Sequence, residues 1–282
     1  MPRPWHGSNS FNGEFCSRTA VLIACRVCEC IPNERADNFQ ISRQGRGIYV
    51  VGIIFILKNE MAKQTNTKRS CCIRCGKCCI KSSPTLQVQD LGLITDGTIK
   101  KTSLYTLRVG EIVQDPVNKK LAQITKSIIK IKEVNENTAC LYFDKKEKDC
   151  TIYDNRPSQC ASLKCWDTDE FMEIFEGETL GIRDIVSDGV LLGLIDEHGK
   201  RCSYSLIEGQ VREIEKGGER VVQEILDILR FDYELRPFIS EKLNLDLEEL
   251  DLYFGRPLMD TIIMFGLKVI QGPDGSFLLT RF

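Results

Sequence analysis

Cysteine is the residue type whose number and spacing most clearly predict chemistry in this sequence. The chain has 14 cysteines and two histidines in 282 residues. Any transition-metal site must therefore be built from thiolates, because imidazole is scarce. The same scarcity argues against a histidine general base or a Ser–His–Asp triad. We expect His198, in Glu197-His198-Gly199, to lie at a solvated helix end.

The densest group of cysteines is Cys72-Ile-Arg-Cys75-Gly76-Lys-Cys78-Cys79. A C-x-x-C pair places two sulfurs on one side of a tight turn, where both can reach the same metal ion. Gly76 suits a left-handed backbone position, which lets amide N–H groups point at sulfur. Cys78 and Cys79 add a third ligand and a spare. Such spacing is found in Cys₄ zinc sites and in iron–sulfur sites.

The remaining ligands are predicted much further along the chain. Cys140 and Cys150 fall in two short β-type runs joined by a charged turn, so we expect them to face each other across a hairpin. Pro157 can open a helix that presents Cys160 about one turn in, with Cys165 just after it. Two Cys₄ sites or one cluster with spares are both possible. The candidate metal ligands are Cys72, Cys75, Cys78, Cys79, Cys140, Cys150, Cys160 and Cys165.

Other cysteines and the charged residues are interpreted more simply. Cys71 and Cys202 are taken as structural or incidental, and the C-x-x-C-x-C run from Cys25 to Cys30 is a weaker metal candidate. Basic residues near the first cluster either lower thiol pKa values or form a solvated turn. They lack interleaved aromatic residues, and a net charge of -2 does not favour nucleic acid as a partner. These basic residues are Lys68, Arg69, Arg74, Lys77 and Lys81.

The sequence predicts a cytoplasmic protein. The apolar run at residues 48–57 is half as long as the roughly 20 residues that a membrane-spanning helix needs, so no membrane association is expected. This run also lies too deep in the chain, and has the wrong flanks, for an export signal. In a reducing compartment, cysteines are held by metals more often than by disulfides.

The predicted fold class is α+β, with a small cysteine-rich metal-binding unit of short strands and hairpins before a mainly helical C-terminal part. Residues 1–60 lack periodicity and are interpreted as a mis-assigned start or a disordered extension, with the natural product beginning at Met61. The intact mass of the native protein would test this. The cysteine domain is placed at residues 61–167, and the helical region, ending in a β-hairpin, at 168–282.

Several elements are predicted from local patterns. A hairpin is expected from Glu111 to Ile124 and a strand around residues 129–133. Val222, Ile225, Leu226 and Leu229 fall at i, i+3, i+4 and i+7, which predicts one buried helical stripe. Further helices are expected at residues 170–176, 182–197 and 258–265, and a final hairpin turns at residues 272–275.

The cysteine pattern resembles that of the YkgJ-type cysteine-cluster family. The resemblance rests on C-x-x-C-G-x-C-C, on Cys140-Leu-Tyr-Phe and on Cys150-Thr-Ile-Tyr-Asp-Asn-Arg-Pro-Ser-Gln-Cys160, within about residues 70–167. It implies zinc or iron chelation by the matching cysteines; Cys165 belongs to a longer subgroup pattern. A similar arrangement occurs in flagellin lysine N-methylases.

Three functions follow as hypotheses. The first is a metal-binding or electron-transfer module with an iron–sulfur cluster or zinc, the compact C-x-x-C-x-x-C element leaning toward iron–sulfur. The second is a protein-lysine N-methylase-like enzyme, although no Gly-rich nucleotide-binding turn is present in the sequence. The third is a zinc-stabilised scaffold for a protein partner. We expect Cys75→Ser to lose metal and much of the fold, because metal binding and folding are coupled.

Overall fold

The computed structural model describes residues 71–114, 120–134 and 139–281. All of them belong to one compact unit, Tyr49–Phe282. The predicted extension at residues 1–60, including Cys25, Cys28 and Cys30, lies outside the described residues. The turn predicted after Gln114 also lies outside them.

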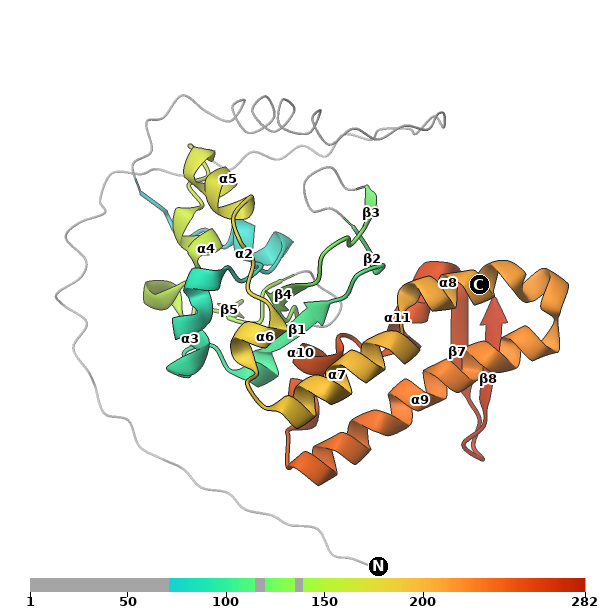
Figure 1. Cartoon of the computed structure of the whole chain (residues 1–282). Helices are drawn as coiled ribbons and strands as arrows, with labels where there is room; N and C mark the ends of the chain where they lie inside the picture. The colour runs from blue at the N-terminus through green and yellow to red at the C-terminus, as the bar shows by residue number, and fades with distance from the viewer. Residues whose placement is uncertain (1–70, 115–119, 135–138, 282) are drawn as a thin grey trace, which may run out of the picture. The chain divides into compact units, whose positions relative to one another are not determined.

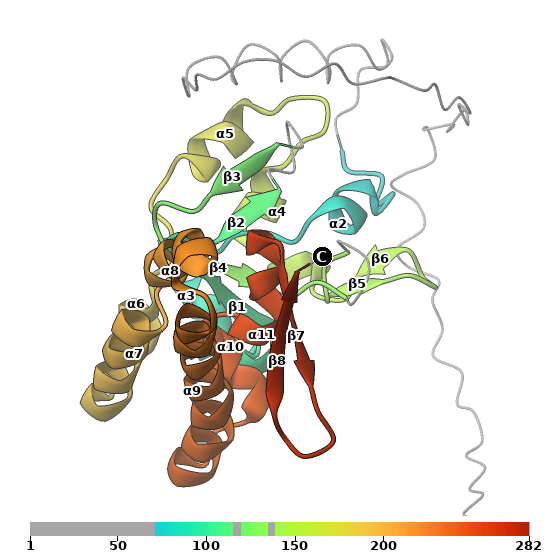
Figure 2. The same ribbon diagram turned by 90° about the vertical axis from the view of Figure 1, so that its right-hand side faces the viewer.

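The strands form four antiparallel pairs in the described residues (Figure 1). β1 (Leu104–Leu107) pairs with β4 (Ile128–Ile131), and β2 (Ile112–Gln114) pairs with β3 (Leu121–Gln123). β5 (Phe143–Asp144) pairs with β6 (Asp149–Cys150). The C-terminal pair is β7 (Leu267–Gln271) and β8 (Phe277–Arg281), and β8 contacts helix α9 (Figure 2). Three of these pairs fall where hairpins were predicted.

Helices dominate the C-terminal part, so the predicted α+β class is confirmed. Four short helices belong to the cysteine-rich half: α2 (Lys77–Lys81), α3 (Leu91–Thr95), α4 (Ser158–Ser162) and α5 (Asp169–Phe175). They are followed by α6 (Ile182–Ile185), α7 (Gly189–Arg201), α8 (Tyr204–Gly217), α9 (Glu219–Leu243), α10 (Leu250–Phe254) and α11 (Leu258–Thr261). No helix in the described ranges is both long enough and apolar enough to cross a bilayer.

Two predicted helices differ from the observed ones. The helix expected at residues 182–197 is divided into α6 and α7, because Asp188 accepts a hydrogen bond from the backbone N–H of Leu191 and so starts a new helix. The segment expected to be helical from Leu258 continues beyond α11 as a 3₁₀ turn, Ile262–Phe265. Three of the four residues in the predicted stripe on α9 are buried, namely Ile225, Leu226 and Leu229, whereas Val222 is half-buried.

Two hydrophobic clusters fill the interior. The first joins the β1–β4 pair to α7, α9 and α10, and it includes Cys140 and Phe143. The second lies among α8, α9 and α11 and includes Cys202. The first cluster therefore crosses the predicted boundary at residue 167, because α10 packs against β1. We expect the cysteine-rich half to depend on the C-terminal helices for part of its core.

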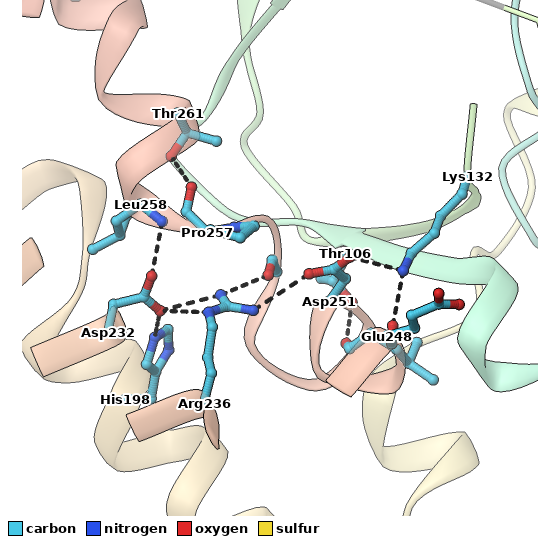
Figure 3. A network of polar contacts seen from close by, with 12 residues as sticks. Thr106, Lys132, His198, Asp232, Arg236, Glu248, Asp251, Pro257, Leu258 and Thr261 are labelled. Carbon is cyan, nitrogen blue, oxygen red and sulfur yellow. Dashed lines mark hydrogen bonds and ion pairs between the residues drawn. The ribbon is translucent and has the colours of Figure 1, made fainter. Parts of the chain in front are cut away.

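A buried polar network lies beside the first cluster (Figure 3). Asp232 is fully buried, and its carboxylate accepts hydrogen bonds from His198 Nε2 at 2.8 Å, from the Arg236 guanidinium and from Leu258 N. Arg236 also donates to Asp251, and Asp251 pairs with Lys132. His198 was predicted to be solvated, and this is wrong: only 2 % of it is exposed.

Replacing Asp232 by asparagine should destabilise the protein by about 3–5 kcal/mol, because it leaves the buried Arg236 without its main counter-charge. Urea unfolding followed by circular dichroism at pH 7 measures this. The matched control is Asp196→Asn, which removes the exposed partner of Arg183 and should cost about 1 kcal/mol or less. An equal decrease in the free energy of unfolding in the two variants would contradict the structural role of Asp232.

The acid sensitivity of the fold should depend on His198. Burial lowers its pKa below the ordinary 6.5; the hydrogen bond to Asp232 opposes this shift, and the nearby charges of Arg108 and Arg236 add to it. Below pH 6.5 the unfolded chain therefore binds a proton that the folded chain does not, and stability falls as the pH drops. The slope approaches about 1.4 kcal/mol per pH unit.

His198→Gln tests this, because glutamine keeps a donor for Asp232 but does not titrate. Urea midpoints measured from pH 8 to pH 5 should fall more steeply for the wild-type chain than for this variant. Other groups contribute equally to both profiles, so the difference reports His198. Parallel profiles would show that its proton plays no part.

Candidate metal centre

The turn that carries the first cysteines depends on Gly76. Its φ is 69°, a left-handed conformation, as predicted. A Cβ at this position would also lie 2.5 Å from the Phe143 ring, so only glycine fits. Helix α2 starts directly after it, and Cys78 and Cys79 lie on that helix. An amide N–H does point at sulfur here, from Arg74 N to Cys72 Sγ at 3.4 Å.

Cys78 and Cys79 form a close pair of thiols. Their sulfurs are 3.8 Å apart. This contact lowers the pKa of Cys78 to about 6 and raises the pKa of Cys79, because the thiol of one stabilises the thiolate of the other. The pair therefore loses its first proton readily and holds its second one tightly.

Cys140 and Cys150 are brought to this pair by backbone contacts. Cys140 N donates to Cys79 O at 2.8 Å, which ties the two cysteines together directly. Cys150 lies in β6, but the residue opposite it in β5 is Phe143, so the expected facing of Cys140 and Cys150 across the hairpin is wrong. The strands are shorter than predicted, and Cys140 precedes β5. Burial raises the pKa of Cys140 to about 11, and Cys150 adds to that shift.

Cys160 is positioned by contacts that start α4. Pro157 was predicted to lie in the first turn of the helix. In the structure it is the N-cap, and the helix begins one residue later, at Ser158. The buried carboxylate of Asp90 accepts hydrogen bonds from the N–H and the hydroxyl of Ser158, at 2.8 and 3.0 Å. Gln159 accepts from Thr85 N at 2.9 Å. These bonds fix the first turn of α4, and with it Cys160, against the segment that follows α2.

Five of the eight predicted ligands lie close enough for the charge of one thiolate to shift the pKa of another. Burial raises the pKa of Cys160, and its thiol neighbours raise it further, as they do for Cys79. Cys140 is buried, Cys79, Cys150 and Cys160 are half-buried, and Cys78 is exposed. We call this set the five-thiol group: Cys78, Cys79, Cys140, Cys150 and Cys160.

The other three predicted ligands, Cys72, Cys75 and Cys165, are exposed. Cys72 is exposed and contacts Tyr153, whose pKa is raised by burial and by this thiol. Cys75 is exposed and lines a pocket of about 350 Å³ with Phe143 and Ile80. Cys165 is exposed and follows α4. Across the described part of the chain, no three Cys, His, Asp or Glu side chains already stand in metal-binding geometry.

Arg156 carries a positive charge that acts on three of the five thiols. The sequence indicated it only as a residue that starts a helix. Its charge lowers the pKa of Cys78, Cys150 and Cys160, opposing the larger effect of burial on the last two. Among the basic residues predicted to surround the cysteines, Arg74 is paired with Asp149 at 3.3 Å, and Lys77 and Lys81 are exposed. Lys68 and Arg69 lie outside the described residues.

The donor set fits a thiophilic metal. All five side chains are thiols, which suit zinc and iron–sulfur centres rather than magnesium or calcium. Two sulfurs bound to one tetrahedral ion at 2.3 Å lie about 3.8 Å apart, which is the separation of Cys78 and Cys79. Cys202 is buried in the second hydrophobic cluster, which contains none of the five thiols.

A comparison with known protein families found a match in the cysteine-rich region. Residues 71–177 match the family model described as "CxxCxxCC: Putative zinc- or iron-chelating domain". No curated protein and no solved structure gives a significant match to the chain. The matched residues contain all eight predicted ligands, and they agree with the resemblance in the cysteine pattern. The cysteine-rich part of this chain, residues 71–177, is therefore similar to the zinc- or iron-chelating domain that this family model describes.

Proposed function

We propose that this chain binds zinc or an iron centre through the five-thiol group, and that it serves as a cytoplasmic metal-binding or electron-transfer module. The observation that carries the proposal is the convergence of these five thiols from four separate segments of the chain. Chance packing would not gather ionisable sulfurs whose thiolates repel one another. A bound cation turns that repulsion into attraction, because each thiolate then faces the metal.

The neighbouring residues have distinct roles in this proposal. Cys78 and Cys79 supply two thiolates to the same ion, and Cys140, Cys150 and Cys160 are available for the remaining positions. Cys72 and Cys75 lie on the adjacent turn, where they can join the coordination once metal is bound. A bound zinc would hold the four segments together, whereas a bound iron centre would also exchange electrons.

The spacing within α2 bears on the kind of centre. A four-iron cluster with Cys₄ ligation uses one thiolate for each iron, whereas a single ion or a two-iron cluster places two thiolates on one metal. The 3.8 Å separation of Cys78 and Cys79 suits the second arrangement. It favours zinc, one iron or a two-iron cluster. The lysine N-methylase alternative would require a binding site for the methyl donor in addition to this centre.

Metal and sulfide analysis of the full chain tests the proposal. After anaerobic purification, we expect either zinc without acid-labile sulfide, or iron with or without an equal amount of sulfide. Visible absorbance near 400 nm distinguishes a coloured iron centre from colourless zinc. A chain that takes up neither metal, even after reduction and anaerobic reconstitution, would refute the proposed function.

Two buried cysteines provide a matched pair of variants. Cys140 belongs to the five-thiol group, and Cys202 lies in the second hydrophobic cluster. Cys140→Ser should lose most of the bound metal, whereas Cys202→Ser should keep it, although both place a hydroxyl in a core. Metal content per chain and the melting temperature measure the two effects separately. Equal metal content in both variants would contradict the assignment of Cys140.

Cys75→Ser separates metal loss from packing loss. The Cys75 side chain is exposed, so its replacement removes little packing. If it becomes a ligand, the variant should melt below the wild-type protein when metal is present, and at the same temperature when both are metal-free. A variant that keeps full metal content and an unchanged melting temperature would exclude Cys75 from the centre.

A further inference from the structure

Two arginines stack on one tyrosine next to the five-thiol group. The guanidinium carbon of Arg74 lies 3.8 Å from the centre of the Tyr153 ring, and that of Arg156 lies 3.9 Å from it. Tyr153 begins a 3₁₀ turn between Cys150 of β6 and Cys160 of α4. An aromatic face attracts a planar guanidinium and restricts its position. An arginine that is already held in this way loses little additional side-chain entropy when it makes another interaction. The ring, which lies in the connection between these two cysteines, therefore holds Arg156 of the same connection and Arg74 of the first cysteine turn.

The two arginines differ in how their charge is balanced. Arg74 forms an ion pair with Asp149 at 3.3 Å, so its charge is largely neutralised. Arg156 has no carboxylate partner within ion-pair distance in the described ranges, and stacking on Tyr153 leaves its charge uncompensated. Arg156 lies in the short connection between Cys150 of β6 and Cys160 of α4, and its stacking on Tyr153 holds its charge in that connection, between two of the five thiols.

A metal centre at this place requires such a charge. Four thiolates around one divalent ion carry a net charge of about -2, and a partly buried anion is costly unless a cation lies near it. We propose that Arg156, clamped on Tyr153, is the counter-cation of the thiolate–metal centre and sets its affinity for metal. Arg156 is a positioning residue here, and no ligand bond is assigned to it. The inference rests on the proposed function.

Titration of the reduced, metal-free full chain with Co²⁺ under anaerobic conditions tests the proposal. Co²⁺ reports thiolate ligation by its charge-transfer absorbance. Arg156→Gln should bind Co²⁺ about tenfold more weakly, as is typical when a group that supports metal ligands is removed, with the same absorbance per bound ion. Arg156→Lys, which keeps the charge, should remain within about threefold of the wild-type protein. Arg74→Gln, on the same ring but with its charge already paired, is the matched control and should also stay within about threefold.

The salt dependence separates a charge effect from a structural one. The ratio of wild-type to Arg156→Gln affinity should shrink as the ionic strength rises from about 0.05 M to about 1 M, because the Debye length shortens. Tyr153→Leu keeps the charge but removes the clamp, and it should fall between wild type and Arg156→Gln. This variant also keeps the proposal testable if Arg156→Gln fails to fold.

Each outcome decides between the two claims. Equal Co²⁺ affinity for wild type and Arg156→Gln would overturn the inference and leave the proposed function intact. An Arg156→Lys loss as large as that of Arg156→Gln, without salt dependence, would also overturn it, because the role would then be structural. A wild-type chain without any thiolate-to-cobalt absorbance would instead refute the proposed function itself.

Discussion

The gathering of thiols in a partly apolar interior is the constraint on which this structure depends. Burial raises the pKa of Cys140, Cys150 and Cys160, and each ionised sulfur makes the next ionisation more costly. The apolar residues around Cys140 supply no positive charge that could offset this. The group can ionise fully only with a cation present. Lys130 acts in this way on Cys140, and Arg156 on Cys78, Cys150 and Cys160; the proposed metal would supply the remaining positive charge.

The scaffold that holds the thiols is assembled over long sequence distances. A backbone hydrogen bond joins Cys140 to Cys79, and Asp90 fixes the start of the helix that carries Cys160. The core around Cys140 then reaches α10, which packs on β1. Cys79, Cys140 and Cys160 are thus placed by contacts with segments far from them in the chain. A short peptide containing Cys72 to Cys79 would lack all of these contacts.

Local sequence patterns predicted the left-handed Gly76, three hairpins and most of the α9 stripe, because these depend on neighbouring residues. The metal ligands stay a prediction. They failed where the deciding partner is remote. His198 looks like an exposed residue until Asp232, 34 positions away, is placed beside it. The pairing of Cys150 with Phe143 depends on strand length and register, which short β-type runs leave open. Arg156 was assigned only to helix initiation, since its neighbours in space are cysteines from other segments.

The two hydrophobic clusters differ in their distance along the structure from the proposed metal centre, because only the first contains one of the five thiols. The cluster with Cys140 and Phe143 also contains Leu250 and Phe254 of α10, so the proposed metal would stabilise part of the C-terminal half directly. The second cluster contains none of the five thiols and is built from α8, α9 and α11. Asp232 links the two, because it lies on α9 and binds both His198 of α7 and the first N–H of α11. Loss of metal should therefore loosen the cysteine-rich half and α10 first, while the α8–α9 pair keeps its own core. A C-terminal part that serves a partner protein would then sense the metal through α10 and the Asp232 network, rather than through the thiols themselves.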